Sequence, residues 1–307
     1  MELKLKDLRY LVAVADERHF GRAAAKCFVS QPTLSAQLRK LEESLGVQLI
    51  ERRPRRVTLT EAGEEIAQRA RTMLATGDAI VQVAQTRRDP LAGQLRVALL
   101  PTIGPYLLPQ IALKLRKALP RLELMLYEYR TEPMLERLHN GDIDVGILAL
   151  PVHDGMLVSR ELYEEPFVLA LPDSHRLAAR AQVRTSDLDE ETLLLLEDGH
   201  CLREQALAIC GKRGGTSPRM VTTSLETLKY IVAAGSGYSL LPTLACELPR
   251  GLGELVQLRD FDERPPSRRI GLCFRRTLSR REGVTALAAF IRKHPPPGVR
   301  VVVPSSG

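Results

Sequence analysis

Two cysteines, Cys201 and Cys210, lie nine residues apart and beside groups that favour thiol chemistry. Cys201 follows His200 and precedes Arg203, at a position where the pattern predicts the start of a helix. Cationic neighbours and a helix N-terminus both favour the thiolate, which is the reactive form of cysteine. We therefore expect the pKa of Cys201 to fall below its usual value of about 8.5.

The spacing of these cysteines restricts how they could react with each other. In one continuous helix, nine residues rise about 13 Å and turn half a revolution, which places the sulfurs on opposite faces. A disulfide needs Cα atoms within roughly 7 Å, so the pair can join only if the segment unwinds. That behaviour would suit a redox switch. The alternative is that both are small buried hydrophobic residues, as free cysteines usually are.

A metal site is disfavoured at the same place. Cys201, Cys210 and His200 lack the short ligand pairs that preorganise zinc. We expect no metal and no cofactor.

Composition and length limit the class of protein. A chain of 307 residues predicts two or more domains, and its 44% hydrophobic and 26% charged residues are typical of a globular protein. The first residues lack an apolar signal core, and no run approaches the roughly 18 apolar residues of a membrane span. We therefore expect a cytoplasmic protein with no membrane partner, where disulfides are mostly transient or sensing. The net charge of +7 permits a nucleic-acid partner.

Residues 6–57 have the pattern of a helix-turn-helix. Apolar residues at helical spacing predict a helix near 8–15, and an alanine-rich helix follows over 22–27. Ser30 is expected to cap the next helix, which Gly46 ends. Polar side chains on the outer face of that helix can reach base edges in a major groove. The residues expected there are Ser30, Gln31, Pro32, Thr33, Ser35 and Arg39.

Two short extended pieces on either side of Pro54 predict a wing rich in arginine. A solvated loop is the alternative interpretation of such a cluster, but a neighbouring helix-turn-helix favours contacts with DNA phosphates. The arginines concerned are Arg52, Arg53, Arg55 and Arg56.

A long helix is predicted over residues 60–88. Apolar or small residues recur at alternating spacings of four and three, which is the pattern of a coiled-coil seam. The seam consists of Ile66, Ala70, Met73, Gly77, Ile80 and Ala84. Pairing with a second copy is expected because DNA sites for such proteins are two-fold. Packing on the chain's own C-terminal domain is the alternative.

Beyond a hinge at 89–93, strands and helices alternate, which predicts a parallel sheet covered on both faces. Thr102 is expected to cap a helix that runs to 119, and Ser224 belongs to a capping box. Ligands in such folds lie at strand ends beside helix starts, where Thr102 and Cys201 are both placed. The expected strands cover 95–100, 122–127, 145–150, 167–171, 193–196, 238–241 and 270–274.

Several motifs together resemble LysR-type transcriptional regulators, which are not enzymes. They lie at 20–24, 29–35, 41–47 and 59–63. The resemblance implies an N-terminal all-α winged helix-turn-helix and a two-lobed α/β regulatory domain like periplasmic binding proteins. The implied boundaries are 1–60 for DNA binding, 61–89 for the linker and dimerisation helix, and 94–307 for the regulatory domain, with lobe I at 94–165 and 270–302 and lobe II at 166–269.

A second set of motifs, at 101–109, 196–203 and 224–237, resembles the hydrogen-peroxide-sensing members of that family. This resemblance implies that Cys201 is the peroxide-reactive thiol and Cys210 its disulfide partner. It further implies a pocket that places peroxide and stabilises the thiolate. The pocket residues implied are Thr102, Thr131, His200 and Arg268, or Arg269 in place of Arg268.

The implied cycle oxidises Cys201 to sulfenic acid, which condenses with Cys210 as the segment unwinds. The glycine-rich stretch 211–215 would ease that rearrangement. The implied partners are promoter DNA, hydrogen peroxide, further copies of the chain in a dimer of dimers, RNA polymerase and thiol reductants. Two rival hypotheses are a regulator that binds a small metabolite between the lobes and a thiol peroxidase, for which a helix-turn-helix has little use.

Overall fold

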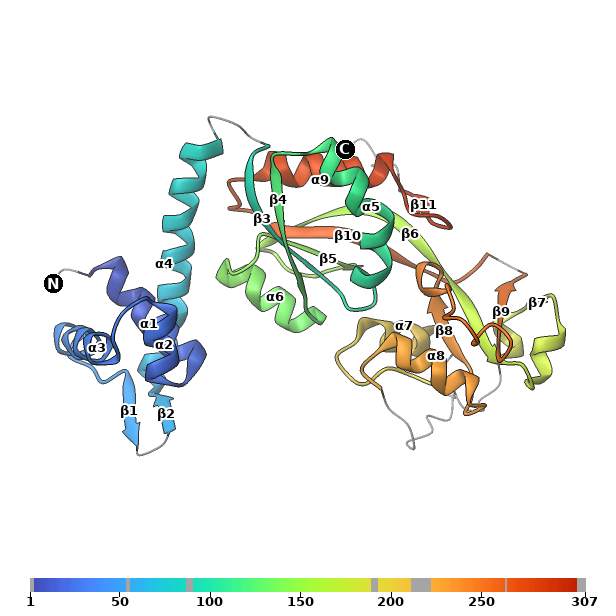
Figure 1. The fold of residues 1–307 in the computed structure, drawn as a ribbon, viewed down its shortest axis with the longest axis horizontal. Helices are drawn as coiled ribbons and strands as arrows, with labels where there is room; N and C mark the ends of the chain where they lie inside the picture. Colours follow the sequence, from blue (N-terminus) through green and yellow to red (C-terminus); the bar gives the residue numbers. More distant parts are fainter. Residues whose placement is uncertain are drawn as a thin grey trace. The chain divides into compact units, whose positions relative to one another are not determined.

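The computed structural model describes residues 3–53, 56–86, 91–188, 193–210, 222–262 and 264–302 (Figure 1). The chain divides into two compact units. One comprises residues 1–88 with the short segment 139–142, and the other comprises residues 89–138 and 143–307. None of the helices within the described ranges has both the length and the apolar character needed to cross a bilayer.

The first unit is a helix-turn-helix with a two-stranded wing and a long helix. Its core is built from the apolar faces of the first three helices and the start of the wing. The second helix begins two residues earlier than expected because His19 caps it, with Nδ1 accepting from the Arg22 amide at 3.2 Å. The elements are α1 (Leu5–Glu17), α2 (Phe20–Lys26), α3 (Gln31–Leu45), β1 (Ile50–Arg53), β2 (Arg56–Leu59) and α4 (Glu61–Thr86).

The junction between the wing and α4 depends on one glycine. A Cβ atom at Gly63 would lie 2.0 Å from the carbonyl oxygen of Leu49. Atoms cannot approach so closely, so only glycine lets the first turn of α4 pack against the chain that enters β1. The same turn is held by Thr60, whose Oγ1 accepts from the Gly63 amide at 3.0 Å and donates to the Gln48 carbonyl at 2.7 Å.

The second unit is built on a mixed sheet, nine strands of which lie in the described residues in the order β4-β3-β5-β10-β6-β9-β7, with β8 and β11 also paired to β6. The expectation of a parallel sheet is wrong as a general statement. β3 pairs in parallel with β4 and β5, whereas β10 runs antiparallel to both β5 and β6. The strands are β3 (Gly93–Leu99), β4 (Leu122–Glu128), β5 (Val145–Leu150), β6 (Leu157–Pro172), β7 (Gln182–Val183), β8 (Ser239–Pro242), β9 (Val256–Phe261), β10 (Ser267–Arg275) and β11 (Arg300–Val301).

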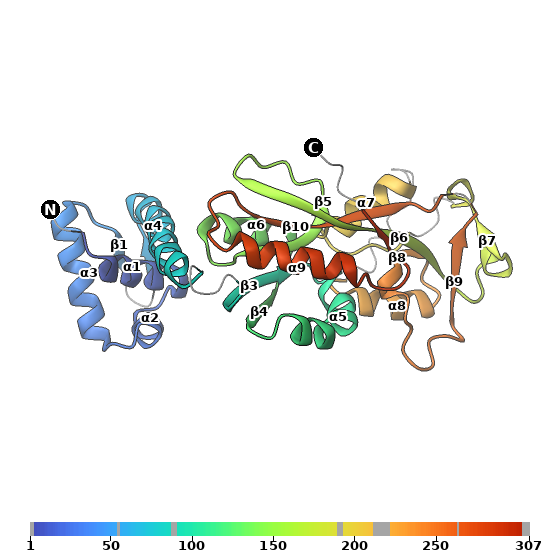
Figure 2. The same ribbon diagram turned by 90° about the horizontal axis from the view of Figure 1, so that it is seen from above.

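Helices cover both faces of this sheet (Figures 1 and 2). α5 and α9 lie in contact with each other, while α6 lies on the opposite face, where Met134 and Leu138 approach Gly146 of β5. The crossover from β3 through α5 to β4 and the crossover from β4 through α6 to β5 run in opposite directions along the sheet, so right-handed connections place α5 and α6 on opposite faces. The helices are α5 (Gly104–Ala118), α6 (Thr131–Asn140), α7 (Cys201–Cys210), α8 (Leu225–Ala233) and α9 (Arg281–Lys293), with short 3₁₀ turns η1 (Arg176–Ala179), η2 (Thr185–Asp187) and η3 (Thr243–Ala245).

The described residues of this unit form two separate apolar cores. One draws its residues from 95–163 and 270–291, and the other from 167–261. β6 passes from the first to the second without a break, pairing with β10 as far as Pro166 and with β8 from Phe167 onward. We call the two halves lobe I and lobe II.

Two local expectations are wrong. Residues 193–196 do not form a strand but make single bridges, Leu193 to Tyr238 and Leu196 to Thr222. Thr102 does not cap α5, which begins at Gly104 with Ile103 as its N-cap residue. Instead, the Thr102 hydroxyl is engaged by a buried arginine, so tertiary contacts replace the local cap. By contrast, Ser224 caps α8 as predicted.

Candidate functional site

The first candidate site is the outer face of α3. Ser30 caps this helix, because its Oγ accepts from the Thr33 amide at 3.3 Å, and Pro32 occupies the first turn. The residues predicted to meet DNA are exposed, apart from Ser35, which is partly exposed. Leu34 and Leu38, on the opposite face, are buried in the core of the unit. The helix therefore presents a polar face to solvent, as the sequence predicts.

The wing forms as an antiparallel hairpin. Arg52 pairs with Val57 and Arg53 with Arg56 along the backbone of β1 and β2. The side chains of these three arginines are not described, and Arg55 lies outside the described residues. Their contacts with phosphate therefore remain a prediction.

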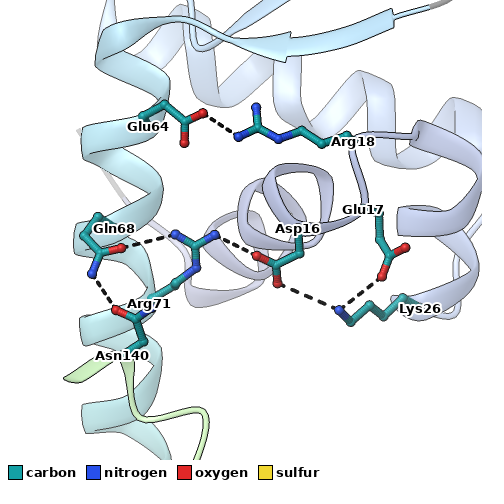
Figure 3. A network of polar contacts seen from close by, with 8 residues as sticks. All are labelled: Asp16, Glu17, Arg18, Lys26, Glu64, Gln68, Arg71 and Asn140. Carbon is teal, nitrogen blue, oxygen red and sulfur yellow. Dashed lines mark hydrogen bonds and ion pairs between the residues drawn. The ribbon is translucent and has the colours of Figure 1, made fainter. Parts of the chain in front are cut away.

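An ionic network joins α1, α2 and the first half of α4 (Figure 3). Arg71 of α4 pairs with Asp16 at 2.6 Å, and Lys26 of α2 reaches the same carboxylate at 3.8 Å. Arg18 pairs with Glu64 at 2.5 Å. Exposed pairs of this kind contribute little stability individually. Together they link the first half of α4 to α1 and its C-terminal end.

The second candidate site is the start of α7, where Cys201 and Cys210 are the first and last residues of one continuous helix. Both are free thiols. They pack against different cores, Cys201 against that of lobe I and Cys210 against that of lobe II. Nine residues of helix separate them by about 13 Å along the axis, so they are too far apart to bond. The structure thus shows the single continuous helix considered from the sequence, with the two thiols unbonded at its ends.

The expected acidity of Cys201 is wrong in direction. Burial raises its pKa, and this effect outweighs the lowering caused by the charge of Arg268, the Thr131 hydroxyl and the backbone amides of residues 201 and 202. The helix start and the arginine act as the sequence suggests. Burial against the core of lobe I, which the sequence does not show, reverses the net shift.

Arg268 of β10 is the arginine that faces this site. It is only 2% exposed, and its Nη1 donates to Thr102 Oγ1 at 3.1 Å while Nη2 donates to the Thr102 carbonyl at 2.8 Å. Its Nε donates to Glu165 Oε2 at 2.8 Å. The neighbouring Arg269 is largely exposed and pairs with Glu161. The structure thus brings Arg268, rather than Arg269, together with Thr102.

Three buried polar atoms near the start of α7 have no well-aligned hydrogen-bond partner among the described residues. They are Thr131 Oγ1, His200 Nε2 and Gln205 Oε1. Unpaired buried polar atoms are costly, so a cluster of them suggests a place for a small polar ligand. Gln205, which sequence reasoning missed, lies one turn beyond Cys201. With Arg268 and Arg269 it lines a cavity of about 550 Å³, whose lining does not include Cys201, Thr131 or His200. The spacing of Gln205 from Cys201 was the available signal.

His200 is not a cationic neighbour of the thiol. Burial lowers its pKa, the charge of Arg130 lowers it further, and Glu197 opposes both. The imidazole is therefore neutral at pH 7. Arg130 itself pairs with Glu197 and donates to the Asp198 carbonyl at 3.3 Å, which fixes the loop before α7.

The remaining cysteines have a different environment. Burial raises the pKa of Cys246 to about 12, and the pKa of Cys210 to about 11. Cys273 is fully buried in lobe I, and burial is the main cause of the raised pKa of Cys27. Of all these thiols, only Cys201 adjoins both a buried arginine and the unpaired polar atoms. No group of three or more metal-ligating side chains occurs in the described parts of the chain.

Comparison with known proteins matches both units. The bacterial regulatory helix-turn-helix protein, lysR family, matches residues 5–64, and the LysR substrate binding domain matches residues 88–296. The hydrogen peroxide-inducible genes activator of Dickeya chrysanthemi is 43% identical over 293 residues, which are 95% of this chain and 96% of that protein.

Two further relatives agree. The DNA-binding transcriptional dual regulator OxyR of Escherichia coli K12 is 43% identical over 291 residues, which are 94% of this chain and 95% of that protein. The structure of full-length OxyR from Pseudomonas aeruginosa is 35% identical, covers 99% of this chain and 100% of that one, and superposes with a TM-score of 0.79. With a winged helix-turn-helix followed by a two-lobed domain, and with relatives of this similarity over nearly its whole length, the chain belongs to the LysR family of bacterial transcriptional regulators.

Proposed function

We propose that this regulator senses hydrogen peroxide through Cys201 and reports its oxidation to DNA. The observation that carries the proposal is the grouping of the Cys201 thiol, the buried Arg268 and the unpaired polar atoms of Thr131, His200 and Gln205 at the start of α7. The relatives named for hydrogen peroxide support the same conclusion. The alternative effector, a small metabolite, would fill the same region without changing a thiol.

The proposed chemistry balances without a cofactor. The Cys201 thiolate attacks one oxygen of hydrogen peroxide, so that an S–O bond forms as the O–O bond breaks, and the departing hydroxide takes a proton to become water. The thiolate of Cys210 then attacks the sulfenic sulfur, and the disulfide forms as a second water leaves. A thiol reductant supplies the two electrons that restore both thiols.

The pocket residues have defined parts in the first step. Arg268 stabilises the thiolate and the developing hydroxide, because its fixed positive charge needs no reorganisation when negative charge appears. Thr102 holds two nitrogens of the guanidinium in place. The neutral His200 imidazole can orient a peroxide oxygen, since its Nε2 has hydrogen-bonding capacity that the described residues leave unused. The Thr131 hydroxyl interacts with the Cys201 thiol, so it can contact a peroxide oxygen beside the attacking sulfur.

The second step couples chemistry to conformation. Because Cys201 packs on lobe I and Cys210 on lobe II, the disulfide requires Cys201 to leave its core and α7 to unwind. The glycine-rich stretch 211–215 that would ease this change lies outside the described residues. The rearranged surface would alter how regulatory domains associate, and so the spacing of the DNA-binding units.

The DNA-binding half of the proposal rests on α3 and the wing. Ser30, Gln31, Pro32, Thr33, Ser35 and Arg39 would face the major groove, with the wing arginines on phosphates. Met73 and Ile80 of α4 are 48% and 69% exposed, which supports pairing of α4 with a second copy, whereas Ala70 is buried within its own unit. A dimer of dimers, contact with RNA polymerase and the domain boundaries given above belong to the same proposal.

The test is treatment of the reduced full-length protein with hydrogen peroxide, followed by mass spectrometry of every thiol and by DNA footprinting. We expect a disulfide between Cys201 and Cys210 and an altered footprint. Cys201→Ser should abolish the response and leave DNA binding intact. If Cys201 oxidises no faster than Cys246 or Cys273, the peroxide proposal fails and binding of a metabolite becomes the better explanation.

A further inference from the structure

A carboxylate that the peroxide chemistry does not use is buried behind Arg268. Glu165 of β6 is 0% exposed. Its Oε2 accepts from Arg268 Nε and lies 2.8 Å from Nη2, and its Oε1 accepts from the Leu244 amide at 3.1 Å. A fully buried glutamate is unusual, because burying a charge is costly unless it is paired.

Arg268 does not depend on Glu165 for its position. Thr102 accepts from Nη1 through its hydroxyl and from Nη2 through its carbonyl. A neutral side chain at position 165 with the same shape could still accept from Nε. The property that Glu165 alone supplies to Arg268 is therefore its negative charge.

We propose that Glu165 sets the resting reactivity of Cys201 by neutralising the positive charge of Arg268. In a buried site, an arginine alone would act on the thiol as a full charge, whereas an arginine paired with a carboxylate acts as a weaker dipole. The sensor would then remain protonated and slow toward adventitious oxidants until peroxide itself occupies the pocket. This inference rests on the proposed role of Cys201.

The thiol lies within reach of the charge of Arg268. Burial raises the pKa of Cys201, and the positive charge of Arg268 is the largest of the influences that lower it. Glu165 and Arg268 also act with opposite signs on the buried Tyr163 hydroxyl, which lies on the same face of β6. Other charges near the start of α7 are also paired, Arg130 with Glu197 and Arg203 with Asp198.

The experiment measures the acidity and the reactivity of Cys201 separately. Reduced full-length wild type and Glu165→Gln would be alkylated with iodoacetamide across a pH series, and the labelling rate of the Cys201 peptide followed by mass spectrometry. We expect the midpoint to fall by about one pH unit in the variant, the lower end of what a nearby charge produces. Oxidation by peroxide at pH 7 should then rise about three- to fourfold, because a tenfold gain in thiolate is partly offset by weaker nucleophilicity.

Glu164→Gln is the matched control. Glu164 is the adjacent carboxylate on the same strand, but it binds Arg264 and Ser267. Its neutralisation should leave the Cys201 midpoint unchanged. A midpoint in Glu165→Gln that is unchanged or higher would overturn the proposal, because a purely structural Glu165 would, when altered, only loosen Arg268 and make the thiol less acidic.

Glu165→Gln leaves the buried Arg268 without a carboxylate partner, and this variant could fail to fold. A second pair of variants tests the proposal in that event. Arg268→Gln should raise the midpoint, and adding Glu165→Gln to it should lower the midpoint again, since both charges are then gone. Failure of the second substitution to lower the midpoint would refute the charge argument. Alkylation of Cys201 does not require peroxide sensing. If Glu165→Gln lowers the midpoint as expected but the protein shows no response to peroxide, the proposed function is refuted and the charge argument stands.

Discussion

Formation of the disulfide should unwind α7, and the number of backbone hydrogen bonds lost follows from the geometry of the helix. Cys201 and Cys210 end a ten-residue helix, and nine steps of about 1.5 Å separate their Cα atoms by about 13 Å. A disulfide allows roughly 7 Å, so no tilt or side-chain rotation can bridge the difference. Of the ten amides, the first four have no partner within the helix. The remaining six, at 205–210, must lose theirs.

Hydrogen exchange measured by mass spectrometry tests this reasoning directly. Six hydrogen bonds at about 1 kcal/mol each correspond to a loss of protection of up to about 10⁴-fold, since 1.4 kcal/mol is a factor of ten. Cys210→Ser treated with the same peroxide is the control, because it stops at the sulfenic acid and should keep its protection. A protein whose disulfide is complete by intact mass while amides 205–210 remain protected would refute the argument.

Four further outcomes are expected. Thr102→Val removes one acceptor of the pocket arginine and should slow oxidation roughly tenfold in stopped-flow, without preventing it. Because burial raises the pKa of Cys201, its thiolate fraction, and with it the peroxide rate, should rise about tenfold between pH 6 and pH 7, and a flat profile would contradict the raised pKa. Gly63→Ala would place a Cβ 2.0 Å from the Leu49 carbonyl oxygen, so urea unfolding should show a loss of at least about 1–3 kcal/mol. Ser35→Ala should relax base preference at one position by about 1–3 kcal/mol in competition binding, and equal affinity for all operators would show that α3 is misassigned.

Local signals in the sequence were sufficient for the helix-turn-helix. Ser30, Pro32 and Gly46 act within a few residues of where they stand, and the structure places the start and end of α3 as they predict. The start of α7 at Cys201 follows for the same reason. Such signals need no knowledge of the rest of the fold.

Features that depend on distant parts of the chain were not predictable in the same way. The antiparallel direction of β10 comes from pairing with β5 and β6, more than a hundred residues earlier. The raised pKa of Cys201 comes from packing against lobe I. Glu165 is the last charged residue before the apolar run 166–172, but its partner at position 268 could only be seen in the structure.

The uninterrupted course of β6 has a mechanical consequence. Proteins that close two lobes around a ligand usually bend at a few loop residues that absorb large changes in φ and ψ. Here the connection is hydrogen-bonded strand on either side of Pro166, and β10 runs antiparallel beside it, so bending would break ladder pairs in both strands. The described connection between the lobes is therefore a pair of strands rather than a loop, and α7 is the element that the proposed disulfide would unwind. Under the proposed function, oxidation of one sulfur would change the surface locally, and a neighbouring copy could read that change without any change in the angle between the lobes.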